Sequence, residues 1–303
     1  MKRILLLSFA ALSFCGCEKK NEVTLEDTLH TFVERKIDTL KVTLQELESA
    51  TAQDELKAHF NDSRNQYKKI EAFVEYYFQG LSRRINGPAL PEIKTDDNVV
   101  NPATGFQVLE ENIDGDSIDL DQLREQVKIL TTDLLFIKQN FGSLPVQDHH
   151  VYELIQHQII RIATLGITGF DSPVALRSIG EASYSLEGIS EAYQQYCLAR
   201  EKKANQDFRR LVQQAVGYLG SKNDFNGFDR LSFIKNYLMP ISVFFEKDFR
   251  SVIDATPHFK DGKVFASHLA DLMQGKSLNP DAFSSFAQSR STPEKVGFGA
   301  DIV

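Results

Sequence analysis

The chain has 303 residues, of which 42% are hydrophobic and 25% are charged, and its formal net charge is −8. This length suffices for one large or two ordinary domains with a well-buried core, and the composition is ordinary for a globular protein. Nucleic acid and anionic lipid bind basic surfaces, so an acidic chain disfavours both as the main partner.

The N-terminus has the pattern of an export signal. Lys2 and Arg3 precede an apolar run over 4–14, which is too short for an ordinary membrane-spanning helix. Gly16-Cys17 then stands before charged residues and resembles the cleavage box of bacterial lipoproteins. We expect a lipid on Cys17 that tethers the chain in the cell envelope, facing the periplasm or the cell surface. Ordinary cleavage without a lipid is the alternative.

Apolar residues recur at steps of three and four in every long segment of the body. From Leu25 to Leu47 they predict one long amphipathic helix, with Thr24 and Asp27 as a capping pair at its start. A second helix is predicted over 52–78, and the two should pack as a hairpin. Further helices are expected at 106–113, 120–141, 146–162, 231–238, 241–253, 264–273 and 280–286, and the segment 173–220 should form two helices or one kinked helix. Ser117 or Asp119 should cap the helix at 120–141, Pro145 should open the next one, and Asp229 should cap the helix at 231–238.

Few alternating runs typical of strands occur in the sequence. The predicted fold class is therefore all-α, an antiparallel helical bundle or two bundles side by side. The first two helices are separated from the rest by a loop of roughly 25 residues, which is long for a compact domain and typical of a functional or packed loop. Its turns are set by Asn86-Gly87-Pro88 and by Pro91.

The helix after this loop carries the most distinctive motif. Gly105-Phe106-Gln107-Val108-Leu109-Glu110 resembles the G-x-H-x-x-E motif of imelysin-like proteins, which are helical bundles of the bacterial cell envelope associated with iron uptake. The surrounding NGPALPEI and TGFQVLEE look closer still to the helical region that precedes the haem domains in Bacteroidetes-type di-haem cytochrome c peroxidases. The resemblance covers most of the mature chain.

The resemblance also implies a domain organisation. It indicates two four-helix-like bundles with a seam near 166–173, and residues 291–303 resemble the lead-in to the first haem domain of those peroxidases. The expected layout is a lipoprotein signal peptide at 1–17, a polar leader at 18–23, an imelysin-like helical domain at 24–290 and a tail at 291–303. The chain is thus expected to be the helical module without its haem domains.

Two sets of residues are candidates for binding a transition metal such as iron. The first is the motif pair Gln107 and Glu110, although an amide replaces the motif's imidazole here and is a poorer ligand. The pair can instead hydrogen-bond the loop and hold it closed. The second is His150, Glu153 and His157, which share a helix face at spacings of three and four and can equally form a solvated polar surface. No fourth ligand for these three residues is identified, and the metal-binding hypothesis combines Glu110 with some of them.

Several catalytic motifs are absent from the sequence. No Cys-x-x-Cys-His occurs, so covalent c-type haem attachment by that motif is excluded, and Cys197 is expected to be a buried, inert thiol. No Gly-x-Ser-x-Gly, Walker or His-Glu-x-x-His motif occurs either. Peroxidase chemistry is therefore not expected of this chain alone.

Three functions follow as hypotheses. The first is a non-catalytic envelope lipoprotein that binds a partner, such as a separate haem or iron protein related to cytochrome c peroxidase. The second is a periplasmic metal-binding protein of iron uptake. The third is a truncated member of the cytochrome c peroxidase family that has lost its haem domains.

Overall fold

The computed structural model describes residues 24–94, 98–203, 205–221 and 224–256. The predicted signal peptide, Cys17, the polar leader, the helices expected at 264–273 and 280–286 and the tail at 291–303 lie outside the described residues. Within them most residues are helical and only two short strands occur, which confirms the predicted all-α bundle.

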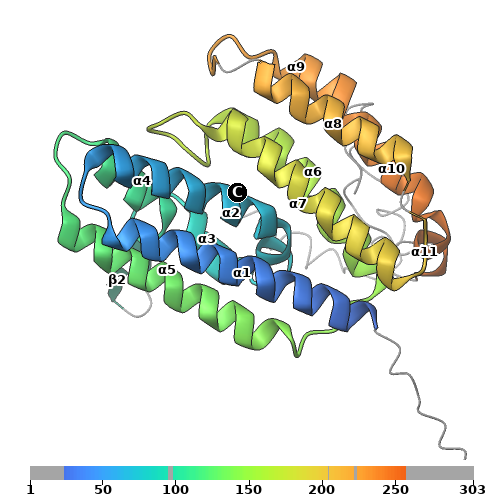
Figure 1. Cartoon of the computed structure of the whole chain (residues 1–303), viewed down its shortest axis with the longest axis horizontal. Coiled ribbons are helices and arrows are strands. Elements are labelled where there is room, and N and C mark those ends of the chain that lie inside the picture. The colour runs from blue at the N-terminus through green and yellow to red at the C-terminus, as the bar shows by residue number, and fades with distance from the viewer. Residues whose placement is uncertain (1–23, 95–97, 204, 222–223, 257–303) are drawn as a thin grey trace, which may run out of the picture.

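The elements follow one another with short connections (Figure 1). In chain order they are α1 (Leu25–Ser49), α2 (Gln53–Tyr77), α3 (Gln79–Asn86), β1 (Glu92–Lys94), β2 (Val99–Asn101), α4 (Phe106–Asp114), α5 (Leu120–Phe141), α6 (Asp148–Thr164), a 3-10 turn (Gly166–Thr168), α7 (Ser178–Ala199), α8 (Gln206–Ser221), α9 (Arg230–Phe233), a π turn (Ile234–Leu238), α10 (Met239–Asp248) and α11 (Arg250–Ala255).

The start of α1 confirms the capping pair. The Thr24 hydroxyl accepts a hydrogen bond from the Asp27 amide at 3.0 Å, and the Asp27 carboxylate accepts from the Thr24 amide at 3.3 Å. Two amide groups that the first turn leaves without helical partners are satisfied in this way. Every residue of the predicted apolar stripe from Leu25 to Leu47 is buried.

Helices α1, α2 and α5 lie side by side, and α7 packs against α1 and α2 (Figure 1). On its other side α7 contacts α6 and α8, and α10 packs on α6 and α8. The buried apolar residues of all these helices form one continuous cluster. The division into two bundles with a seam near 166–173 stays a prediction; these residues form the connection between α6 and α7.

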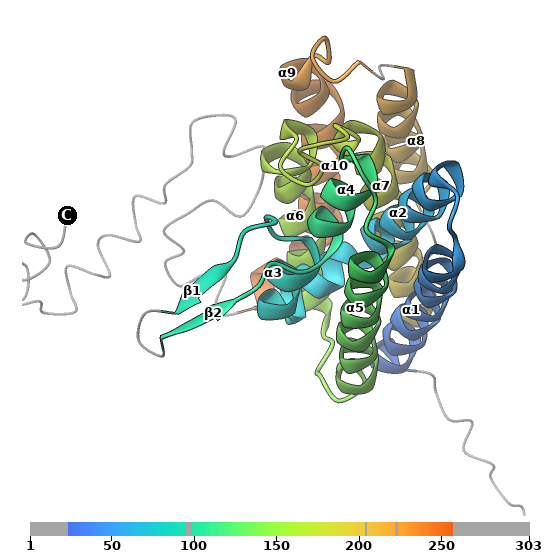
Figure 2. The ribbon, with the colours of Figure 1, turned by 90° about the vertical axis from the view of Figure 1, so that its left-hand side faces the viewer.

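The loop that follows α2 contains more structure than the sequence predicted. It begins with α3 and continues as an antiparallel hairpin in which Ile93 pairs with Val100. Three-residue strands are too short to give the alternating pattern by which strands are recognised. The hairpin projects from the helical body (Figure 2).

Other predicted boundaries agree with the structure. The Asp119 carboxylate caps α5 by accepting from two backbone amides at 3.0 Å, and the Asp229 carboxylate caps α9 by accepting from the Ser232 amide. The segment 173–220 forms two helices rather than one kinked helix. Among the described helices, none combines the length and the apolar character that crossing a membrane requires.

Candidate functional site: a buried charge network

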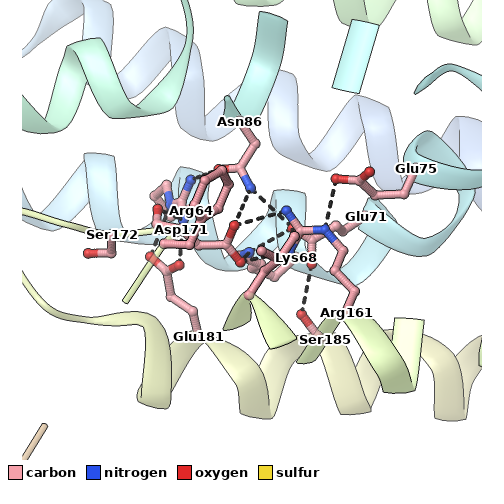
Figure 3. Close-up of polar contacts among 12 residues, drawn as sticks. Arg64, Lys68, Glu71, Glu75, Asn86, Arg161, Asp171, Ser172, Glu181 and Ser185 are labelled. Atoms are coloured by element: carbon pink, nitrogen blue, oxygen red, sulfur yellow. Dashed lines mark hydrogen bonds and ion pairs between the residues drawn. The ribbon is translucent and has the colours of Figure 1, made fainter. Parts of the chain in front are cut away.

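One face of α2 carries charged residues where an apolar stripe is expected. Arg64, Lys68, Glu71 and Glu75 follow one another at steps of four, three and four, so they share a face of the helix. The first three are at most 3% exposed. Figure 3 shows them meeting side chains of α6, α7 and the connection between those helices.

Asp171, in the connection after α6, lies at the centre of this network. Its carboxylate accepts hydrogen bonds from Lys68 at 2.7 Å, from Arg161 at 2.7 and 2.9 Å, and from the Asn86 amide at 3.0 Å. Burial alone would raise the pKa of Asp171, but the charges of Lys68 and Arg161 outweigh it and hold that pKa far below its usual range. Asp171 is therefore a carboxylate in the folded protein.

Arg64 joins the network to α7. Its guanidinium donates to both carboxylate oxygens of Glu181, at 3.0 and 2.5 Å, and to the backbone carbonyl of Asp171 at 2.7 Å. It also donates to the Asn86 side-chain oxygen and lies over the Phe106 ring at 5.2 Å. The two parallel bonds to Glu181 are the arrangement in which a guanidinium binds a carboxylate most strongly.

Glu71 is the second centre. One of its oxygens accepts from Lys68 at 2.6 Å and lies 3.2 Å from the Arg161 guanidinium. The other accepts from Gln158 at 2.7 Å and from the Ser185 hydroxyl at 3.2 Å. Glu71 thereby links α2 to both α6 and α7.

The charges of the network balance closely. The buried cations Arg64, Lys68 and Arg161 face the buried anions Glu71, Asp171 and Glu181, and Glu75 accepts from Arg161 at the margin. Burying charges is costly, and the cost is recovered only when geometry is good and the remaining donors and acceptors are satisfied. The charged side chains of the network meet that condition, whereas the side-chain oxygen of Gln158, which donates to Glu71 through its amide nitrogen, is buried without a hydrogen-bond partner among the described residues. The evident role of the network is to fix the register of α2, α3, α6 and α7.

The motif residues Gln107 and Glu110 support the same region from α4. The Gln107 amide donates to the Phe170 carbonyl at 2.8 Å and to the Asn86 carbonyl at 3.3 Å. Glu110 accepts from the Ala175 amide at 2.9 Å and from the Ser172 hydroxyl. Burial raises the pKa of Glu110, and these hydrogen bonds oppose that rise. Both residues are thus engaged with the connection between α6 and α7, not only with their own loop.

Gly105 begins the motif for a steric reason. It has φ of +99°, a conformation that other residues rarely adopt, and a Cβ atom would lie 2.2 Å from the Arg84 carbonyl oxygen. Its amide donates to the Gln126 side chain at 3.0 Å. The glycine lets α4 start against the end of α3, which places Gln107 and Glu110 beside the network.

The residues predicted to shape the loop divide into two groups. Asn86 is 2% exposed and belongs to the network, and the adjoining Gly87 ends α3 by donating to the Arg83 carbonyl at 2.9 Å. Pro88 and Pro91 are exposed and lead into the hairpin. The turn signals therefore mark the point where the chain leaves the interior.

The second metal candidate lies on α6. The His150 ring accepts from the Gln147 amide at 3.1 Å, and Glu153 accepts from the Tyr76 hydroxyl. Burial lowers the pKa of His157, which favours the neutral imidazole. Over the residues that the structure describes, no three His, Cys, Asp or Glu side chains are placed to hold one metal ion, so Glu110 and the α6 residues are not brought together as a ligand set.

Cys197 is buried as expected, at 2% exposure, and burial raises the pKa of its thiol. A thiol in this state is a weak nucleophile because the thiolate is the reactive form.

The sequence contains one local signal for the network. On α2 the apolar residues Phe60 and Tyr67 are separated by a position that Arg64 fills, one helical turn after Phe60. A charged residue within an apolar stripe indicates a buried ion pair. Its partners Asp171 and Glu181 carried no comparable local signal.

Comparison with known protein families found no family model that matches this chain, and comparison with curated proteins found no significant match.

Proposed function

We propose that this chain is a non-catalytic, imelysin-like module of the bacterial cell envelope that serves as an accessory to a haem or iron protein. The observation that supports the proposal is the burial and internal hydrogen bonding of Gln107 and Glu110. They are 3% and 2% exposed, and their hydrogen bonds go to other parts of this same chain. Because these motif residues are buried and bonded within the chain, we assign binding of the haem or iron protein to the surface of the bundle.

Attachment to the envelope is the second part of the proposal. It rests on the positive start, the apolar run and Gly16-Cys17 in the sequence. Two cysteines stand close together, which offers a matched pair of variants. Cys17→Ala should release the protein from the membrane fraction of the expressing bacterium, whereas Cys15→Ala should leave it there. Release by neither variant would contradict lipid attachment at Cys17.

Partner binding can be tested with the protein lacking its lipid. The immobilised chain is incubated with detergent-solubilised envelope extract, and the retained proteins are identified by mass spectrometry and by haem staining. An immobilised helical protein of similar net charge serves as the control for non-specific retention. Enrichment of a haem or iron protein over the control supports the proposal, and its absence contradicts it.

The metal-binding alternative predicts a different result. Natively purified protein would contain stoichiometric iron or another transition metal by elemental analysis, and Glu110→Ala or His157→Ala would lower that content. If the chain is a truncated peroxidase that binds haem without the Cys-x-x-Cys-His motif, the purified protein should show a Soret absorption band. Metal content below stoichiometric level, with no Soret band, favours the accessory module.

A further inference from the structure

The dipeptide Asn-Gly occurs at two places in the sequence, Asn86-Gly87 and Asn226-Gly227. Asparagine is one of the chemically labile residues of proteins. It reacts most readily before glycine, because a residue without a Cβ atom leaves the next backbone nitrogen free to approach the side-chain carbonyl carbon. The structure places the two asparagines in opposite surroundings, which decides which of them can react.

Asn86 is held in the interior of the bundle. It is 2% exposed, its side-chain oxygen accepts from Arg64, and its side-chain nitrogen donates to Asp171 at 3.0 Å (Figure 3). The Gly87 amide contains the nitrogen that would attack, and it donates to the Arg83 carbonyl at 2.9 Å. Reaction at Asn86 therefore requires the charge network to open.

Asn226 is in the opposite state. It lies between α8 and α9, it is exposed, and within the described residues its side chain has no hydrogen-bond partner. The Gly227 amide, which contains the attacking nitrogen here, donates to the Asp224 carboxylate at 3.0 Å in the same exposed turn. One exposed hydrogen bond contributes little free energy and slows such a reaction by about tenfold at most.

We propose that Asn226 is a site of spontaneous deamidation in the folded protein and that the charge network protects Asn86 from the same reaction. The Gly227 backbone nitrogen attacks the Cγ atom of Asn226 and loses its proton to solvent. The new C–N bond closes a succinimide ring, and the side-chain nitrogen takes up a proton and leaves as ammonia. Water then adds to either ring carbonyl and breaks the bond from that carbon to the ring nitrogen, which gives aspartate or isoaspartate.

The modification should affect contacts beyond this turn. Aspartate adds a negative charge, and isoaspartate also adds a methylene group to the backbone. The Arg230 guanidinium donates to the Phe225 carbonyl at 3.0 Å and to the Phe228 carbonyl at 3.2 Å. It also donates to the Ile167 carbonyl, after α6, at 2.7 Å. A longer backbone between Phe225 and Phe228 displaces these acceptors, so deamidation should loosen the contact that Arg230 makes with Ile167.

The test is incubation of the full chain in warm, mildly alkaline buffer, followed over time by tryptic digestion and mass spectrometry. The two asparagines fall in separate peptides, 85–94 and 223–230. Fragmentation assigns the change to residue 226, and each deamidation raises the mass by about 1 Da because OH replaces NH2. Asn226 should be converted about a hundredfold faster than Asn86, since the buried asparagine reacts only after the network opens.

Two controls separate protection by the structure from the reactivity of the dipeptide. In urea-unfolded protein the two sites should react at similar rates, because the native hydrogen bonds are lost. Gly227→Ala adds a Cβ atom beside the attacking nitrogen and should slow conversion of Asn226 while leaving Asn86 unchanged. Equal folded-state rates at the two sites, or an Asn226 that reacts in urea but stays intact in the folded protein, would overturn the proposal.

The effect on the Arg230 contact is measured by thermal unfolding before and after incubation. The unmodified protein should melt at a lower temperature once residue 226 is converted. Asn226→Gln, incubated in the same way, should keep its melting temperature. An unmodified protein whose melting temperature stays constant through full conversion would overturn the link between this site and Arg230.

Discussion

Arg161 and Asp171 form two parallel hydrogen bonds, at 2.7 and 2.9 Å, although only ten residues separate them along the chain. The pair folds the connection after α6 back over the end of that helix. In this position Asp171 also reaches Lys68 on α2, so one carboxylate fixes the connection to two helices.

Asp171→Asn should destabilise the protein strongly. The substitution removes one of the two carboxylates that Arg161 and Lys68 share in a dry interior, the other being Glu71, and breaking a buried ion pair typically costs about 3–5 kcal/mol. Urea denaturation followed by circular dichroism measures the loss. Asp148→Asn is the control, because Asp148 pairs with Arg200 at a part-exposed site and should cost about 1 kcal/mol or less. Similar losses for the two variants would contradict the structural role of the network.

The same carboxylate should make the protein sensitive to acid. The pKa of Asp171 is lower in the folded state than the ordinary value of 3.8, so its contribution to stability is full above that value. The contribution is then lost as the pH falls from about 4 toward the folded-state pKa. Unfolding free energies measured between pH 5 and pH 2.5 should fall more steeply for the unmodified protein than for Asp171→Asn. Parallel curves would argue against a lowered pKa.

Glu110 should have the opposite pH dependence. Burial raises its pKa above the ordinary 4.5, so the folded protein holds this proton more tightly than the unfolded chain does. The associated stability is present below pH 4.5 and is lost as the pH rises through the folded-state pKa. Glu110→Gln retains an acceptor oxygen without the charge, so its stability relative to the unmodified protein should increase from pH 4 to pH 7.

The control for this prediction is Glu111→Gln, since Glu111 is the exposed neighbour on the same helix. Its effect on the unfolding free energy should stay within about 0.5 kcal/mol at both pH values. A Glu110→Gln variant whose relative stability is the same at pH 4 and pH 7 would contradict the raised pKa.

The close packing of α2 on α7 depends on Gly188. A Cβ atom there would lie 2.4 Å from the Lys69 carbonyl oxygen, on the backbone of α2. Gly188→Ala should therefore separate the helices and destabilise the protein by about 1–3 kcal/mol. Gly180→Ala, in the same helix but with no atom within 4 Å of its Cβ position, should be neutral or stabilising by up to about 1 kcal/mol. Thermal unfolding of both variants compares them directly, and equal melting temperatures would refute the steric argument.

The helices could be predicted from the sequence because their signals are local. The stripe of α1, its Thr24 cap and the Asp119 cap of α5 each depend on residues within a few turns of one another. The charge network could not be predicted in the same way. Arg64 and Glu181 are 117 positions apart, and charges at helical spacing on α2 are more often a solvated face.

The motif residues show the same limit. The spacing of Gln107 and Glu110 allows them to bind a metal or to hydrogen-bond the loop, and it cannot choose between these roles. Their hydrogen bonds to Phe170, Ser172 and Ala175 depend on how α6 and its following connection return to α4. The hairpin could not be predicted for a different reason: its strands have three residues each, which is too short to show the alternation of apolar and polar residues typical of a strand.

The ion pair between Arg64 and Glu181, which are far apart along the chain, also affects how the protein opens and folds. Drawing α7 away from α2 would leave Arg64 without Glu181, its carboxylate partner, before water could reach the guanidinium, so partial opening at this contact is costly. The backbone amides of both helices should exchange with solvent together, in one cooperative event. Folding, in turn, must bring distant segments together before any of these charges is stabilised, which places formation of the network late in the process.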